Sequence, residues 1–296
     1  MLNGRFMPNR GLVFSDRAEP FVRVFTPEGV LQYAFMRAGD GPGEVRVAPN
    51  VSVNAAGRML VSVSDRLSLW QDSVLIAQTR SRYPVVATGP GCGDEWLVYE
   101  AGPMSRGRRI WLRGLRIAAS GTVSRALWED TATVPLGYGK RLLASDGTRI
   151  ALLHENGVPP TLHVFTCEGD SIRHTWSVAV DTTAAPRRQR SSAGGPYEHG
   201  LISSQRRIRA GIAVLGEGVV LAGYWRVDSA AYQTDFALVT RRHVRRVAVT
   251  GRYAILDARV GTGILLRLSE PFPRAILVDD KLFMDVLRSA PAMPHR

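Results

Sequence analysis

A six-residue sequence occurs twice in the chain and differs at only one position. Residues 24–29 read VFTPEG and residues 164–169 read VFTCEG, so the two copies lie 140 positions apart. An internal repeat constrains a fold more tightly than composition does, because each copy marks the same unit of a repeated architecture. We therefore expect a chain built from repeats.

A predicted β-hairpin is centred on each copy. Around the first copy, residues 21–25 alternate apolar and polar side chains, residues 27–29 form a turn, and residues 30–35 continue as a second strand. A shorter repeat lies upstream, where residues 11–17 (GLVFSDR) are echoed by residues 57–66 (GRMLVSVSDR). The pattern predicts antiparallel strands joined by tight turns.

The spacing of the repeats predicts six units. Four more segments open with a glycine or a turn and continue with β-branched or apolar residues: 94–99, 147–153, 218–224 and 252–256. Units of this length with about four short strands are typical of propeller blades. We predict an all-β fold, a six-bladed β-propeller with about four antiparallel strands per blade and one blade incomplete or closed by both termini. A pair of β-sandwiches is the alternative, but it gives no reason for the repeat.

The segment between the first two units carries a recognisable motif. Residues 37–44 read RAGDGPGE, between a strand that follows VFTPEG and a strand that ends in Asp65. This order resembles the bacterial six-bladed propellers related to NHL repeats, in which Gly-x-Gly-Pro-Gly-Glu recurs. The resemblance is close over residues 11–72 and loose beyond. It implies the architecture first, because that family includes binding and scaffold modules, sensor domains and a minority of enzymes.

The resemblance also implies how the propeller closes. Unit one is expected to lack its innermost strand, which residues 274–279 or 282–287 would then supply. Residues 1–10 lack the apolar core of a signal peptide, so the chain as written is expected in the cytoplasm. Relatives carry an export signal upstream, and with such a segment the location would be periplasmic, lipoprotein or secreted. We place the blades of a single domain at residues 1–36, 45–80, 84–128, 138–180, 208–249 and 250–288, with 181–207 as an insertion.

The charge of the chain comes almost entirely from arginine. The formal charge is +12, and among 38 basic residues only Lys140 and Lys281 are lysines. A general bias toward arginine explains part of this excess without any contact to phosphate. No apolar run reaches the roughly 20 residues of a membrane span, so no membrane-spanning helix is predicted. The protein is expected to be a monomer. Arginine is densest at residues 106–116, 187–190, 206–209 and 241–246.

The two cysteines are expected to be unpaired. Cys92 and Cys167 lack the spacing of a metal site, and one pair in a chain of 296 residues is no disulfide framework. A single disulfide between them is the alternative.

Loop lengths predict which face of the propeller binds. Connections between the first and second and between the third and fourth strands of a blade are tight, as at residues 54–57 and 167–169. The other connections are long and polar, and loops on a rigid scaffold carry function more often than tight turns do. The composition of the longest, residues 181–207, favours disorder, with a lid over the central channel as the alternative.

Candidate binding residues lie in these long connections. Asp40 to Gly43 is interpreted as a turn between blades rather than a phosphate loop, since no lysine and helix follow it. Glu44 is expected to accept hydrogen bonds within that turn or to face the channel mouth, and Asp16 and Asp65 are expected to accept backbone N–H groups of their own loops. The predicted binding residues are Arg37, Asp40, Glu44, Asp65, Arg66, His154, Glu155, His199, Tyr224, Arg226 and Asp257.

Three classes of function remain open. The leading hypothesis is a non-enzymatic binding or scaffold propeller that holds a protein, a peptide or a small polar ligand, with no cofactor. The second is a metal-dependent hydrolase or lyase at the axial channel, with Ca²⁺ as the divalent cation. The third, least favoured, is nucleic-acid binding through the arginines. The candidate metal ligands of the second class are Glu44, Asn50, Asp65 and Asp257, with His154 and Glu155 also considered.

Overall fold

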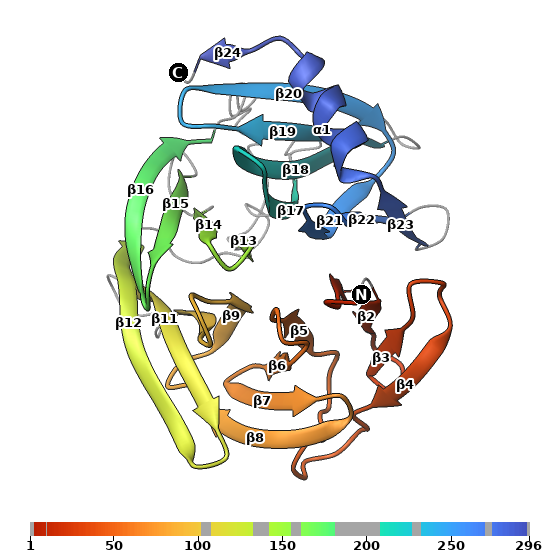
Figure 1. Cartoon of the computed structure of the whole chain (residues 1–296), viewed down its shortest axis with the longest axis vertical. Coiled ribbons are helices and arrows are strands. Elements are labelled where there is room, and N and C mark those ends of the chain that lie inside the picture. Colours follow the sequence, from red (N-terminus) through yellow and green to blue (C-terminus); the bar gives the residue numbers. More distant parts are fainter. Residues whose placement is uncertain are drawn as a thin grey trace, which may run out of the picture.

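Six antiparallel sheets stand in a ring around a central axis (Figure 1). The structure is a computed structural model and describes residues 3–9, 11–101, 108–132, 142–154, 161–180, 208–226, 232–269 and 274–294. The prediction of an all-β, six-bladed β-propeller is confirmed.

The strands of each blade follow one another in the chain, with the first strand innermost. Blade one contains β1 (Asn3–Phe6), β2 (Leu12–Ser15), β3 (Val22–Phe25) and β4 (Leu31–Phe35). Blade two contains β5 (Asn50–Val53), β6 (Met59–Val63), β7 (Arg66–Gln71) and β8 (Val74–Arg80). Blade three contains β9 (Val85–Pro90), β10 (Trp96–Ala101), β11 (Arg108–Ala118) and β12 (Gly121–Ala132).

The second half of the ring departs from this plan near its end. Blade four contains β13 (Leu142–Ser145), β14 (Arg149–His154), β15 (Thr161–Glu168) and β16 (Ser171–Ala179). Blade five contains β17 (Ile208–Leu215), β18 (Gly218–Arg226), β19 (Tyr232–Val239) and β20 (His243–Thr250), and β24 (Met293–Pro294) pairs with the outer edge of β20. Blade six contains β21 (Tyr253–Arg259), β22 (Gly263–Leu268) and β23 (Arg274–Val278), followed by α1 (Asp280–Ser289).

The repeated hexapeptide forms the outer hairpins of blades one and four. Residues 24–29 end β3 and turn into β4, and residues 164–169 end β15 and turn into β16. Gly29 and Gly169 have φ angles of +84° and +58°, a conformation that glycine adopts without steric cost. The prediction of a hairpin at each copy is confirmed, and the two hairpins lie three blades apart.

Apolar side chains fill the seams between successive blades. Clusters of buried residues join blades one and two, two and three, three and four, four and five, and five and six. In the first of these clusters Val13 and Val24 of blade one meet Val51 and Trp70 of blade two. Within the described residues, no such cluster occupies the sixth seam, between blade six and blade one.

The sixth seam is closed by polar contacts between β1 and β21. The half-buried carboxylate of Asp257 accepts a hydrogen bond from the backbone N–H of Phe6 at 2.8 Å. Arg5 donates to the carbonyl of Leu256, and Arg259 donates to the carbonyl of Met7 at 2.9 Å. The two ends of the ring therefore meet side by side without exchanging a strand.

This closure corrects the predicted one. Blade one does not lack its innermost strand, because β1 supplies it from a stretch of only four residues. Residues 274–278 form the third strand of blade six, and residues 282–287 lie in a helix. Neither segment completes blade one, so both expectations for a closing strand were wrong.

Helix α1 was missed because its apolar residues, which are half of the segment, were interpreted as a possible closing strand. The side chain of Asp279 caps the helix by accepting from the backbone N–H of Leu282 at 2.8 Å. Met284 and Leu287 are buried in the cluster between blades five and six, where Phe283 contacts Phe236 edge to face. The helix thus covers the outside of this seam (Figure 1).

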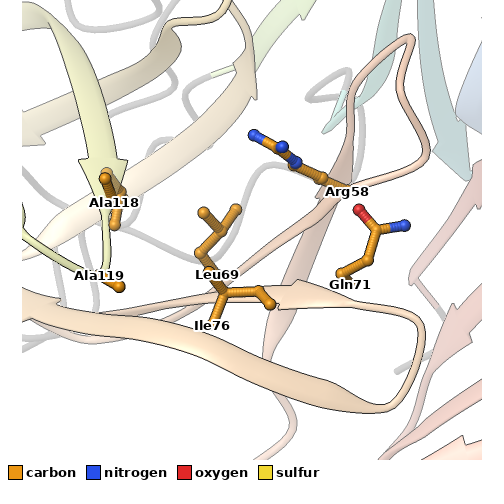
Figure 2. A pocket seen from close by; sticks show the side chains of 7 residues that line it. Arg58, Leu69, Gln71, Ile76, Ala118 and Ala119 are labelled. Atoms are coloured by element: carbon orange, nitrogen blue, oxygen red, sulfur yellow. The ribbon is translucent and has the colours of Figure 1, made fainter.

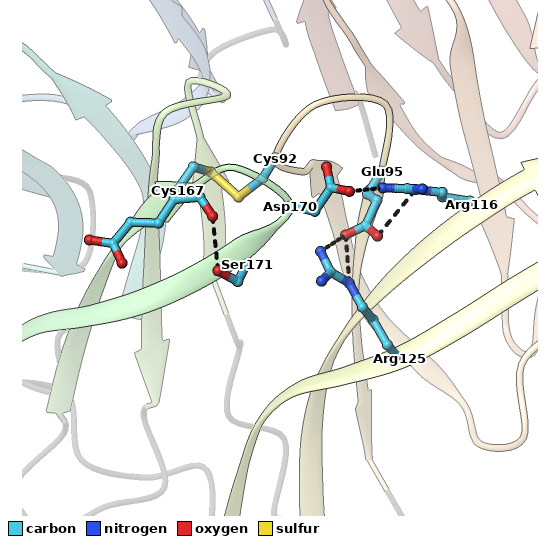
Figure 3. Close-up of polar contacts among 8 residues, drawn as sticks. Cys92, Glu95, Arg116, Arg125, Cys167, Asp170 and Ser171 are labelled. Carbon is cyan, nitrogen blue, oxygen red and sulfur yellow. Dashed lines mark hydrogen bonds and ion pairs between the residues drawn. A yellow bond between two sulfur atoms is a disulfide. The ribbon is translucent and has the colours of Figure 1, made fainter.

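A disulfide between Cys92 and Cys167 joins blades three and four (Figure 3). Cys92 lies in the connection between β9 and β10, Cys167 lies in β15, and their Cα atoms are 5.5 Å apart. The expectation of two unpaired thiols was wrong, because the ring brings together two positions that are 75 residues apart in the chain.

Charged residues surround this disulfide (Figure 3). The buried carboxylate of Glu95 accepts from Arg125 at 2.6 Å and pairs with Arg116 at 3.4 Å. Arg116 also pairs with Asp170 of blade four. A Cβ on Gly114 would lie 2.5 Å from the Glu95 carboxylate, so a glycine is needed there to admit that group. Blades three and four are therefore held by both a covalent and an ionic link.

We expect the variant Asp257→Ala to destabilise the protein by about 1–3 kcal/mol, because the Phe6 N–H would be left buried and unpaired. Asp257→Asn should cost much less, since an amide oxygen can accept the same bond. Urea unfolding at neutral pH measures both. Equal losses in the two variants would contradict this role.

A comparison of the native protein with Asp257→Asn also tests the pKa of Asp257. Burial raises its pKa, against the opposing effects of Arg5 and the backbone donors. Between the unfolded value of about 3.9 and the higher native value, the folded state binds more protons than the unfolded state. The stability of the native protein relative to Asp257→Asn should therefore rise as the pH falls through that window.

Removing the disulfide should lower the free energy of unfolding by about 4 kcal/mol in the chain-entropy account, given a closed loop of 75 residues. The double variant Cys92→Ala, Cys167→Ala is compared with the native protein by urea unfolding without reductant. Reductant should lower the stability of the native protein and leave the double variant unchanged. Two titratable thiols in the unreduced, unfolded protein would contradict the pairing.

Candidate functional site

The two faces of the ring differ in their connections. The turn face carries the short turns between first and second and between third and fourth strands, such as residues 54–58 and 72–73. The long-loop face carries the remaining connections, including residues 36–49 and 81–84. The predicted residues Glu155 and His199, and the whole segment 181–207, lie outside the described residues.

Three predicted binding residues hold the loop between blades one and two together. Glu44 accepts from Arg37 at 3.0 Å and from the backbone N–H of Gly41 at 2.9 Å, and Asp40 accepts from Arg46 at 2.8 Å. The Gly41 hydrogen bond, and after it Arg37, lowers the pKa of Glu44. Glu44 thus stays ionised as an acceptor within the turn, which is one of the two roles expected of it.

Asp65 and Arg66 lie beside that loop. Asp65 pairs with Arg80 at 3.0 Å, and its carbonyl accepts from the backbone N–H of Ser81 at 2.7 Å. Arg66 donates to the carbonyl of Gly41 at 3.1 Å. The structure therefore brings Arg37, Asp40, Glu44, Asp65 and Arg66 together on the long-loop face of blades one and two.

The other predicted residues lie elsewhere. Asp257 belongs to the seam between blades six and one, and Asp16 accepts from the N–H of Arg17 at 2.6 Å in its own loop. His154 ends β14, Arg226 ends β18, and Tyr224 lies two residues before that end. These residues form no single group with the loop of blades one and two.

The candidate calcium ligands do not fit a shared ion. Glu44 and Asp65 each face an arginine, Asp257 accepts from Phe6, and the Asn50 side-chain oxygen lies 3.5 Å from the Asn3 amide. Calcium needs six to eight oxygens converging on one point. In the described part of the chain, no group of three or more His, Cys, Asp or Glu side chains is arranged to hold a metal.

A stack of aromatic and arginine side chains lies where blades two and three meet on the long-loop face. The rings of Tyr83 and Trp111 are parallel, with an interplanar angle of 10° and centroids 4.7 Å apart. The Arg82 guanidinium lies 5.3 Å from the Tyr83 ring, and that of Arg113 lies 5.6 Å from the Trp111 ring. We call these four residues the arginine–aromatic stack.

Buried polar contacts hold one end of this stack in place. Arg113 donates to the buried carboxylate of Glu100 at 2.7 Å, and the Ser81 hydroxyl donates to the other oxygen of that carboxylate. Glu100 and Trp111 are paired residues on neighbouring strands. Residues 81 and 100 therefore attach the loop between blades two and three to the strands beneath it.

Arg82 is the member of the stack that is available for binding. Its side chain is exposed, and within the described residues it has no carboxylate partner. A guanidinium lying against an aromatic ring keeps its N–H donors for a carboxylate or phosphate. The stack thus presents a positioned positive charge on the face with the long loops.

Sequence analysis missed this group because its members are far apart in the chain. Residues 81–84 read SRYP and residues 111–113 read WLR. Arginine is dense at residues 106–116, but nothing in that segment indicates which tyrosine Trp111 contacts. Only the pairing of neighbouring blades brings the two segments together.

Comparison with known proteins supports the fold and goes no further. No protein-family model matches the chain, and no curated protein matches it. A presumed exported protein of Bacteroides fragilis is similar with a TM-score of 0.59 and 13% identity, over 99% of this chain and 87% of its own. The WD40 domain of SCAP from fission yeast gives a TM-score of 0.37 and 12% identity, over 100% of this chain and 74% of its own.

The first likeness shows the propeller fold alone, and the second is too distant to carry an argument. The resemblance of residues 37–44 to NHL-related propellers is not confirmed by a family match. No helix in the described residues is long and apolar enough to cross a membrane.

Glu100→Ala should destabilise the protein by about 3 kcal/mol, because it leaves the half-buried Arg113 without its counter-ion. The matched variant Asp40→Ala removes an exposed partner of Arg46 and should cost at most about 1 kcal/mol. Thermal unfolding of both variants makes the comparison. Similar losses would show that Glu100 does not anchor the stack.

Proposed function

We propose that the protein is a non-enzymatic binding propeller that holds an acidic segment of a protein or peptide on its long-loop face. The observation that carries this proposal is Arg82, an exposed cation that lies over the ring of Tyr83, which stacks on Trp111, and that has no carboxylate partner in the described residues. Tyrosine, tryptophan and arginine are the residues most enriched at protein interfaces.

Four of the acids on this face are already paired with arginine. Asp40, Glu44, Asp65 and Glu100 each face an arginine, so their charges are already compensated. Arg66 is held by a backbone carbonyl, and Arg82 by an aromatic ring. An incoming carboxylate therefore meets uncompensated positive charge near both residues.

A peptide fits the stack better than single-stranded nucleic acid does. Nucleic-acid platforms offer an open aromatic face on which a base stacks. Here one face of each ring meets the other ring, and an arginine also lies over each ring. Binding through the guanidinium of Arg82 leaves this arrangement undisturbed, whereas stacking of a base would displace it.

The disulfide supports a location outside the cytoplasm. Disulfides persist in secreted and periplasmic proteins and are reduced in most cytosolic ones. The bond between Cys92 and Cys167 therefore favours the periplasmic or secreted alternative.

A labelled peptide of ten glutamates tests the proposal by fluorescence anisotropy at low salt. The native protein should bind it, and Arg82→Ala should weaken binding about tenfold, the effect of losing a charge-assisted hydrogen bond. Tyr83→Ala should weaken it less, because Arg82 keeps its charge but loses its support.

Two comparisons make this test specific. Arg173→Ala removes an exposed arginine on β16 of blade four and should leave binding within twofold of the native protein. Equal losses from Arg82→Ala and Arg173→Ala would mean general charge attraction and would reject the site. Tighter binding of a ten-residue oligothymidylate than of the glutamate peptide would favour the nucleic-acid hypothesis instead.

A further inference from the structure

A small pocket opens on the turn face, between blades two and three (Figure 2). The arginine–aromatic stack lies on the opposite, long-loop face. The volume of the pocket is about 240 Å³. We call it the turn-face pocket. Seven residues line it: Arg58, Leu69, Gln71, Ile76, Ile117, Ala118 and Ala119.

The walls of the pocket are aliphatic and come from both blades. Leu69 and Ile117 are buried and belong to the cluster that fills this seam, so they form a fixed floor. Ile76 lies on the outermost strand of blade two and is 40% exposed. Ala118 ends β11 and Ala119 lies in the turn to β12, where small side chains leave the space open.

Two polar side chains lie along the side of the pocket that blade two provides (Figure 2). Arg58 follows the turn between β5 and β6, and its backbone N–H donates to the Asn54 side chain at 2.9 Å. Gln71 ends β7, directly before the turn to β8. The local backbone therefore fixes where both side chains start.

Both polar side chains are free to bind a ligand. Within the described residues, the Arg58 guanidinium has no ion-pair or hydrogen-bond partner, and neither has the Gln71 amide. Asp72 follows Gln71 in the chain and lies near Tyr33 of blade one, where burial first and the charge of Asp72 second raise the pKa of the phenol. A cation and an amide thus stand beside an aliphatic hollow with nothing to bind.

We propose that the turn-face pocket binds a carboxylate joined to a short branched aliphatic chain. The carboxylate pairs with Arg58 and accepts from the Gln71 amide, and the chain lies against Leu69, Ile76 and Ile117. Arginine matches a carboxylate with two parallel N–H donors. This inference is independent of the proposed function, because it concerns the other face and another ligand.

The size of the pocket limits the ligand. A volume of 240 Å³ is below the roughly 300 Å³ at which ordinary small-molecule sites begin. At about 30 Å³ for each water-sized group it holds on the order of eight heavy atoms, the size of 4-methylpentanoate. The same chemistry occurs as a free small acid and as the C-terminal leucine of a peptide.

Ligand-detected NMR with 4-methylpentanoate measures the binding, for which a Kd of about 1 mM is expected from eight heavy atoms. The neutral 4-methylpentanamide has the same shape and should bind at least about tenfold more weakly, since it lacks the charge-assisted pair with Arg58. Arg58→Gln should remove this discrimination. Since Arg58 is exposed, its replacement should leave the melting temperature unchanged.

Two further variants locate the site. Ala118→Leu, which fills the pocket, should abolish binding of both the acid and the amide. Arg82→Ala, on the opposite face, should leave binding of the acid unchanged, so failure here and failure of the proposed function are told apart. The inference is overturned if the acid and the amide bind alike to the native protein, or if Arg58→Gln binds the acid as well as the native protein does.

The tripeptide Gly-Gly-Leu distinguishes the two sources of the ligand. With a free C-terminus it should bind if the pocket takes the end of a peptide, and its C-terminal amide should not. Binding of 4-methylpentanoate without binding of the tripeptide assigns the pocket to free small acids. Failure of both probes to bind at concentrations above the expected Kd rejects the site.

Discussion

The meeting of blade six with blade one is the contact on which the ring depends. The other five seams are filled by buried apolar clusters, whose stability grows with the area that they remove from water. At the sixth seam the carboxylate of Asp257 and two arginine side chains bind backbone groups across the gap. These bonds depend on direction as well as contact, so they fix how β1 and β21 align.

The repeated parts of the fold could be predicted from the sequence, whereas the parts that occur only once could not. The hexapeptide located the outer hairpins of two blades, because a turn and its glycine are local features. Strand β1 has four residues, too few for a clear periodic pattern, and the short apolar run of α1 was compatible with a strand as well as with a helix. The disulfide and the arginine–aromatic stack depend on which blades are neighbours, which no local pattern contains.

The structure shows what many of the arginines bind. The excess of arginine suggested phosphate binding, yet most of the arginines with described contacts pair with acids or backbone carbonyls inside the protein. Arg58 and Arg82 are among the exposed arginines that have no carboxylate partner in the described residues. These two lie on opposite faces of the propeller, so the sites proposed around them are separate and differ in size and surroundings.

Because the two ends of the ring meet without sharing a strand, the sixth seam is the place where we expect the ring to open first under load. A load applied to β1 acts on a few hydrogen bonds at the sixth seam before it reaches any apolar cluster. An opening that spreads from there through blades one and two is stopped at the third seam by the disulfide between Cys92 and Cys167. At the other end, β24 pairs with blade five rather than blade six. Helix α1, which precedes it, packs on the cluster between these blades and so holds the last blade in place. The molecule should therefore yield from its first blade and hold longest at its centre.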